Sequence, residues 1–138
     1  MNADDFRQAA GVSRETLERL TAYADLLVKW QAKINLVGPD TIPSLWRRHF
    51  LDSAQVFPLL PQGIHRLVDM GSGAGFPGLV LAVMGVGDVH LIESDARKCA
   101  FLREAARITG TPVTVHNARI ENLAPLGADV EAAAGGIE

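Results

Sequence analysis

A glycine-rich turn between two apolar segments is the part of this sequence whose residue types and spacing best fit ligand chemistry. Residues 69–78 read DMGSGAGFPG, after an apolar segment that ends in Leu67-Val68 and before one that begins Leu79-Val80-Leu81. Glycines let a ligand approach the main chain, and the start of a helix offers free backbone N–H groups. The sequence therefore predicts a site for a nucleoside-containing cofactor at a strand-to-helix turn.

Two cofactor classes fit this turn. Gly73, Gly75 and Gly78 satisfy the dinucleotide pattern G-x-G-x-x-G, with Glu93 about 20 residues further on as the ribose acid, as in an NAD-type enzyme. Asp69 and Gly71 favour S-adenosylmethionine instead, because an acid at the strand end suits a cationic amino group and opposes a pyrophosphate. A glycine turn that packs a helix on a strand without any ligand is the third interpretation.

A second group of carboxylates follows the apolar residues 89–92, VHLI. Glu93 ends this predicted strand at the carboxyl edge of the sheet, where open α/β sheets bind ligands, and a carboxylate can accept hydrogen bonds from both ribose hydroxyls. The alternative is that Glu93 only ends the strand. Asp95 is interpreted as the N-cap of the next helix, with Cys99, Leu102 and Ala106 on the apolar face of that helix.

The surrounding elements are expected to form an α/β unit behind a helical region. Strands are predicted near 66–70, 89–93 and 113–116, with helices near 78–84 and 96–108. Upstream, apolar residues at helical spacing predict a helix that begins after Ser13 and a second one from Thr41 to before Pro58, with a turn at 34–40. We therefore expect an N-terminal helical region, 1–62, and a Rossmann-like donor-binding region, 63–138, within one structural domain.

Composition limits the function classes. The chain has 138 residues, of which 48% are hydrophobic and 21% charged, typical of a globular protein. No apolar run reaches the length of a membrane span and no secretory leader is evident, so a cytoplasmic location is expected, with no membrane partner. The four histidines lack metal-ligand spacing, so no metal is expected, and the single cysteine, Cys99, is expected in the core.

Several motifs together resemble one known family. Residues 30–36 read WQAKINL, 48–53 read RHFLDS, the loop ends in GFPG at 75–78, and 91–94 read LIES, followed by Lys98 and Phe101-Leu102. In this order and spacing the chain, from about residue 15 to 130, resembles the bacterial RsmG (GidB) methyltransferases. The resemblance implies a class I, Rossmann-like S-adenosylmethionine-dependent fold and methylation of guanine N7 in small-subunit ribosomal RNA.

The resemblance also implies site residues. Gly71 and Phe76 match donor-binding positions of the loop, Glu93 matches the ribose acid, and Ile120 and Glu121 match a pair that lies along the adenine. With Asp69 and Gly73 from the loop, these residues form the expected cofactor site. No catalytic side chain is expected, because guanine N7 carries a lone pair and needs no base.

The same resemblance leads to an expectation about the C-terminus. Family members have a sheet of about seven strands and a donor-contacting arginine after the fourth, whereas the family pattern stops after Val130 and that arginine is absent. We therefore expect a C-terminally truncated family member with an incomplete sheet, which could be an inactive cofactor-binding remnant. An open edge on strand 66–70 would favour self-association.

Residues 28–48 are locally basic and supply the candidate RNA contacts, namely Lys33, Arg47, Arg48 and His49. The alternative is a solvated helix face on which Arg48 pairs with Asp52 at i,i+4. A formal net charge of −3 means that attraction to a ribosomal RNA or ribosomal particle must be local.

Overall fold

Parallel strands form the sheet of this protein. The computed structural model describes residues 1–122 and 130–133. Within them, four parallel strands are arranged in the order β3-β2-β1-β4: β1 (Arg66–Met70), β2 (Val89–Glu93), β3 (Thr114–Asn117) and β4 (Val130–Ala133). Because the strands are parallel, the ends of β1, β2 and β3 meet at one carboxyl edge, with Met70 beside Ile92 and Glu93 beside Asn117.

The pairing of β4 corrects one expectation from the sequence. β4 hydrogen-bonds along β1, with Arg66 in register with Val130 and Asp69 with Ala133. The edge of β1 expected to be open is therefore paired over these residues. The sequence allowed for a stub of a fourth strand, but a parallel partner reaches β1 through a crossover connection, so its pairing with β1 does not follow from strand spacing.

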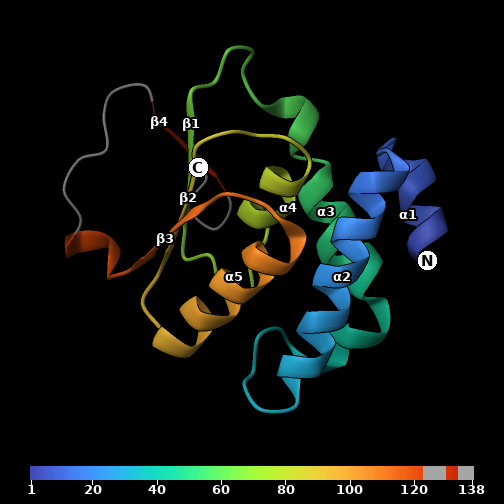
Figure 1. Cartoon of the computed structure of the whole chain (residues 1–138), viewed down its shortest axis with the longest axis horizontal. Coiled ribbons are helices and arrows are strands. Elements are labelled where there is room, and N and C mark those ends of the chain that lie inside the picture. The colour runs from blue at the N-terminus through green and yellow to red at the C-terminus, as the bar shows by residue number, and fades with distance from the viewer. Residues whose placement is uncertain (123–129, 134–138) are drawn as a thin grey trace.

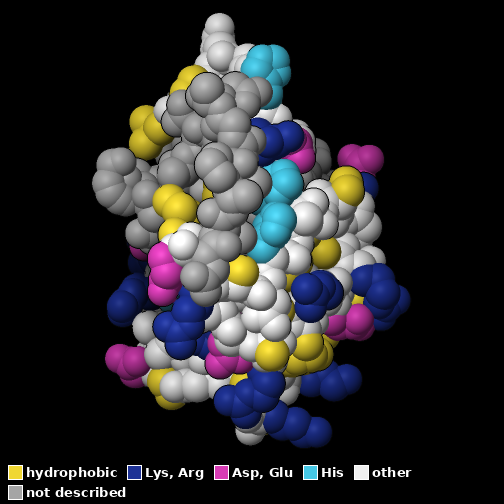
Figure 2. All heavy atoms as spheres, turned by 90° about the vertical axis from the view of Figure 1, so that its left-hand side faces the viewer, with side chains coloured by type: hydrophobic (Ala, Val, Ile, Leu, Met, Phe, Trp, Pro, Cys, Tyr) yellow, Lys and Arg dark blue, Asp and Glu magenta, His cyan; other side chains and the backbone are white. Residues whose placement is uncertain are grey.

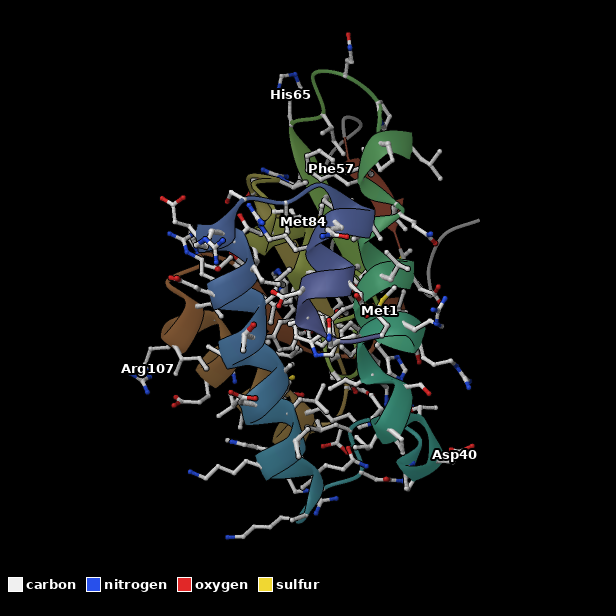
Figure 3. All side chains as sticks on the ribbon, turned by 90° about the vertical axis from the view of Figure 1, so that its right-hand side faces the viewer. Met1, Asp40, Phe57, His65, Met84 and Arg107 are labelled. Atoms are coloured by element: carbon white, nitrogen blue, oxygen red, sulfur yellow. The ribbon has the colours of Figure 1, made fainter. Side chains whose placement is uncertain are left out.

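Helices cover one face of the sheet in two successive layers (Figure 1). Helices α4 (Gly78–Val83) and α5 (Ala96–Thr109) lie directly on the strands, and α1 (Ala3–Ala10), α2 (Arg14–Gln31) and α3 (Asp52–Ala54) lie outside them. Figure 3 views the outer layer, with Asp40 at its lower end and Phe57 and His65 toward its upper end. No helix of the described residues is both long and apolar enough to cross a bilayer.

N-capping residues in the sequence correctly predicted where two helices begin. The Ser13 side chain accepts a hydrogen bond from the Thr16 N–H at the start of α2, and Asp95 accepts from Arg97 and Lys98 at the start of α5. The sequence prediction missed α1. Its capping box, in which the side chains of Asn2 and Asp5 each accept from the other residue's backbone N–H, was the available signal.

The predicted second helix, from Thr41 to before Pro58, is wrong as one continuous element. It is divided into a 3₁₀ helix η1 (Pro39–Ser44), a π-helical segment η2 (Trp46–Leu51), α3 and a second 3₁₀ helix η3 (Phe57–Leu59). η1 also begins inside the predicted turn. Pro43 lies inside η1, lacks an N–H and cannot donate to an α-helical ladder, which favours the tighter 3₁₀ turn there.

The core joins the helical region to the sheet. Tyr23 and Phe6 from the N-terminal helices, Phe50 from η2 and Phe101 from α5 are fully buried in one cluster with Leu91 of β2. The apolar residues whose helical spacing predicted α2 include Leu17, Leu20, Ala24 and Leu27, and all four are buried, as is Cys99. The helical region 1–62 therefore shares its core with the strands and helices that follow it.

Candidate functional site

The glycine loop runs from the end of β1 to the start of α4 and is tied to β2. The N–H groups of Gly71 and Ser72 both donate to the Ile92 carbonyl, at 2.9 and 3.0 Å. Gly71, Gly73 and Gly75 have φ values of 79°, 57° and 101°, the left-handed region that favours glycine. The glycines therefore lie at the three positions of this loop where the backbone adopts a left-handed conformation.

Glu93 occupies the center of the carboxyl edge, where its two oxygens bridge the loop and α5. Oε1 accepts from the Gly73 N–H at 2.8 Å and Oε2 from the Asp95 N–H at 2.9 Å. Only 8% of this residue is exposed. Since each carboxylate oxygen has two acceptor sites, the two backbone bonds orient Glu93 and leave it able to accept further hydrogen bonds.

A cavity of about 210 Å³ opens beside Glu93. It brings together four of the residues predicted from the sequence: Gly71, Glu93, Ile120 and Glu121. The other lining residues are Ile92, Ser94, Ala118 and Arg119. Sequence reasoning did not select Ser94, Ala118 or Arg119, although their positions just after β2 and β3 place them at the ligand-binding edge of the sheet.

Asp69 lies on the helix-facing side of β1 and does not line this cavity. It is fully buried, and its Oδ2 accepts from the Gly78 N–H at 2.8 Å, while Oδ1 has no partner. Burial raises the pKa of Asp69 to about 7, reinforced by the charge of Glu93 and opposed by the Gly78 N–H. Its direct contact is with the start of α4.

Phe76 and Gly73 also lie outside the cavity lining. Phe76 stacks on Tyr23, with ring centroids 5.6 Å apart, and on His49 at 5.0 Å. The Tyr23 hydroxyl donates to the Ala74 carbonyl at 2.7 Å, a contact across 51 residues of sequence. Tyr23 therefore joins α2 to the glycine loop, a role that the helical spacing of the apolar residues did not reveal.

The four candidate RNA residues lie on two separate segments. Lys33 follows α2, whereas Arg47, Arg48 and His49 lie in η2; the lysine and both arginines are exposed. The Nε2 of His49 is 2.9 Å from Thr41 Oγ1, and burial, reinforced by the charge of Arg48, lowers the pKa of His49. Arg48 and Asp52, both described, do not form the ion pair considered as the alternative.

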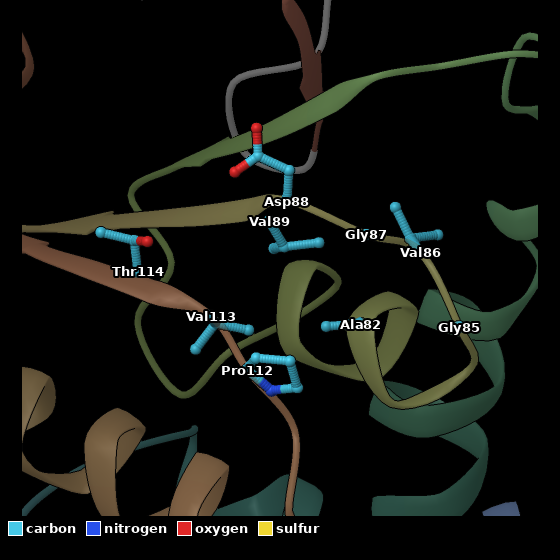
Figure 4. Close-up of a pocket in the computed structure, with 9 residues that line it drawn as sticks. All are labelled: Ala82, Gly85, Val86, Gly87, Asp88, Val89, Pro112, Val113 and Thr114. Carbon is cyan, nitrogen blue, oxygen red and sulfur yellow. The ribbon is translucent and has the colours of Figure 1, made fainter.

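A second cavity, of about 390 Å³, lies at the opposite, amino edge of the sheet (Figure 4). Asp88 is the one charged residue in its described lining, and its carboxylate is already paired with Arg66 at 2.7 Å and His90 at 2.9 Å. Apart from Thr114, the remaining lining side chains are small and apolar, as at Val89 and Val113. The chemistry expected for a cofactor is therefore concentrated at the carboxyl edge.

Comparison with known families identifies the family of this chain. Residues 16–133 match the family model described as GidB, rRNA small subunit methyltransferase G. The chain belongs to this family. A methyltransferase family implies a methyl donor, which disfavours the dinucleotide that the same glycine spacing would allow. No cluster of three metal-ligating side chains is found in the described part of the GidB-family chain.

Curated relatives in this family are similar over most of the chain. The ribosomal RNA small subunit methyltransferase G of Paramagnetospirillum magneticum is 73% identical over 130 residues, covering 94% of this chain and 63% of the relative. The proteins of the same name from Rhodospirillum centenum and Rhodospirillum rubrum are 62% and 57% identical, covering 95% and 94% of this chain and 61% and 65% of the relatives. This chain thus spans just under two thirds of their length.

Proposed function

We propose that this chain supplies the donor-binding part of an S-adenosylmethionine-dependent enzyme that methylates guanine N7 in small-subunit ribosomal RNA in the cytoplasm. The observation that carries the proposal is the Glu93 carboxylate, which two backbone N–H groups hold beside Gly71 in the carboxyl-edge cavity. Family membership adds the methyl transfer and the RNA substrate.

The residues at the cavity fit an adenosyl group. Glu93 retains acceptor sites for the two ribose hydroxyls, and Ile92 and Ile120 offer apolar surface to an adenine ring. At Gly71 a Cβ would have nothing within 4 Å, so the main chain there is open to close approach. Glu121 adds a polar side chain to the lining, and the Gly73 N–H supports the site by holding Glu93 in place.

We propose that Asp69 and Phe76 support the glycine loop and do not contact the donor directly. The unpartnered Oδ1 of Asp69 adds negative potential under the glycine loop when the group is ionised, and a nearby donor cation would favour that form. Phe76, stacked between Tyr23 and His49, fixes the end of the loop. Both residues would then influence donor binding through position and charge.

The methyl transfer requires no acid or base side chain. A sulfonium donor supplies an activated methyl group, and guanine N7 already presents a lone pair, so no proton has to leave before attack. The work of the chain is to hold the donor, align the base and exclude water. For the RNA, we propose contacts from Lys33, Arg47 and Arg48, and from the ring of His49, whose pKa is lowered by burial.

Isothermal titration with S-adenosylmethionine tests the donor site, with NAD as the comparison ligand. Saturable binding of the methyl donor and none of NAD is expected. Glu93→Ala should weaken donor binding at least about tenfold, because hydrogen bonds to a charged group contribute about 1.5–3 kcal/mol each. Glu18→Ala removes the same charge from an exposed position on α2 and should leave binding unchanged.

Methylation is tested separately, with small-subunit ribosomal RNA, small-subunit particles and radiolabelled donor. Label at guanine N7 supports the complete proposal. Saturable donor binding without any label would restrict the chain to cofactor binding, and equal binding of NAD and methyl donor would refute the assigned cofactor.

A further inference from the structure

A cavity of about 380 Å³ lies between the end of α2 and the first turns of α5. Its lining, which we call the basic groove, consists of Lys29, Trp30, Lys33, Ile34, Arg97 and Ala100. Lys29 and Lys33 stand on one wall and Arg97 on the other, and all three are exposed. Seen from the side of the sheet, lysine and arginine side chains gather at the lower end of the molecule, around apolar atoms (Figure 2).

Local contacts hold the shape of the groove. The Trp30 ring packs edge-on against Phe101 of α5, with centroids 5.5 Å apart and an interplanar angle of 65°. After α2 the chain turns sharply, because the N–H groups of Lys33 and Ile34 both donate to the Trp30 carbonyl, at 2.9 and 3.0 Å. Trp30 and Ile34 therefore form a fixed, half-buried apolar floor.

The three cations of the groove form none of the ion pairs found among the described residues. The side chains of Lys29, Lys33 and Arg97 make no ion pair or hydrogen bond with a described acidic side chain. The carboxylate nearest in sequence to Arg97, that of Asp95, accepts hydrogen bonds from the N–H groups of Arg97 and Lys98, and these hydrogen bonds together with the charges of both side chains lower the pKa of Asp95. Three cations around an apolar floor fit an anionic chain that also carries flat apolar groups.

The groove and the donor cavity share the start of α5. Glu93 accepts the Asp95 N–H at 2.9 Å, and α5 begins at the next residue, so Arg97 follows Glu93 by only four residues. A strand whose target nucleotide reaches the donor cavity would have its neighbouring nucleotides near this groove.

We propose that the basic groove binds a single-stranded segment of the substrate RNA next to the target nucleotide, an inference that rests on the proposed function. Lys29, Lys33 and Arg97 bind consecutive phosphates, and one base stacks on Trp30. Single-stranded RNA suits the site because unstacked bases can lie on aromatic side chains, whereas a duplex buries them.

Fluorescence anisotropy with a labelled single-stranded RNA, at several salt concentrations, tests the groove. Lys29→Gln/Arg97→Gln removes one cation from each wall. We expect about tenfold weaker binding and a salt-dependence slope reduced by about 1.4, since each phosphate contact on a single strand contributes about 0.7. The matched pair Arg14→Gln/Arg19→Gln removes the same charge from exposed positions at the other end of α2 and should change affinity less than about twofold.

The stacking step has its own readout. The chain has two tryptophans, so Trp46→Phe leaves Trp30 as the reporter, and RNA should quench its emission. The groove is refuted if both charge pairs weaken RNA binding equally, if an RNA duplex binds as tightly as the single strand, or if Trp30 emission is unaffected at saturation. Donor titration of each variant separates the two proposals: failure of wild-type chain to bind donor refutes the function, and intact donor binding with groove-independent RNA binding refutes only the groove.

Discussion

Replacing Tyr23 by phenylalanine removes a single hydroxyl that joins α2 to the glycine loop. Tyr23 is fully buried, and its hydroxyl donates to the Ala74 carbonyl at 2.7 Å. The ring itself remains packed in the variant, edge-on against Phe50 at 5.0 Å and parallel to Phe76 at 5.6 Å. The substitution therefore tests the hydrogen bond with little change in packing.

The expected cost follows from what the hydroxyl leaves behind. Ala74 is 3% exposed, so water cannot readily replace the lost donor at its carbonyl. An unsatisfied buried acceptor costs about 1–3 kcal/mol, and we expect Tyr23→Phe to lower the free energy of unfolding by that amount. If the released loop populates other conformations, the affinity for the methyl donor falls in proportion to the fraction of molecules that keep the binding conformation. A conformational free-energy cost of about 1.4 kcal/mol would lower this affinity up to about tenfold.

Urea unfolding and donor titration measure the two effects. Thr109→Val is the matched control, because the buried Thr109 hydroxyl donates to the Ala105 carbonyl at 2.8 Å at the far end of α5. It should lower stability while donor affinity stays unchanged. Unaltered stability in Tyr23→Phe would refute the assigned role of the hydroxyl, and an equal loss of donor affinity in both variants would show that the loop has no special dependence on Tyr23.

Three further predictions concern single side chains. Burial raises the pKa of Asp69 to about 7, so the folded protein keeps a proton that the unfolded chain releases above about pH 4. The free energy of unfolding should therefore fall as the pH rises from about 4 to 7, by at most about 1.4 kcal/mol per pH unit. Urea titrations of Asp69→Asn should show a flatter dependence of the free energy of unfolding on pH. Gly78→Ala would place a Cβ 2.6 Å from both Asp69 Oδ2 and Leu91 Cδ2, so a loss of about 1–3 kcal/mol is expected in urea unfolding, and an unchanged midpoint would contradict the packing argument. Ser13→Ala removes the acceptor for the Thr16 N–H and should cost about 1 kcal/mol by the same assay, with donor affinity unaltered as the sign that the effect stays within α2.

Short-range interactions explain which elements the sequence determined by itself. The caps at Ser13 and Asp95 act over two or three residues, so the residue types alone fix where α2 and α5 begin. The same holds for the strand, glycine loop and helix at 66–83, where apolar runs and left-handed turns are encoded locally. The position of Glu93 at the carboxyl edge was predictable because the apolar residues before it mark a strand that ends there.

Contacts between distant segments required the tertiary structure. Nothing local links Tyr23 to Ala74, and the direction of the Asp69 side chain, onto Gly78 and away from the cavity, depends on which face of β1 the helices cover. The basic groove exists only because α2 packs against α5, which places Arg97 opposite Lys29. Sequence patterns encode interactions within a few residues. The Tyr23–Ala74 contact and the basic groove arise instead from packing of segments that lie 50 or more residues apart, where many pairings satisfy the same pattern and the shared core selects one.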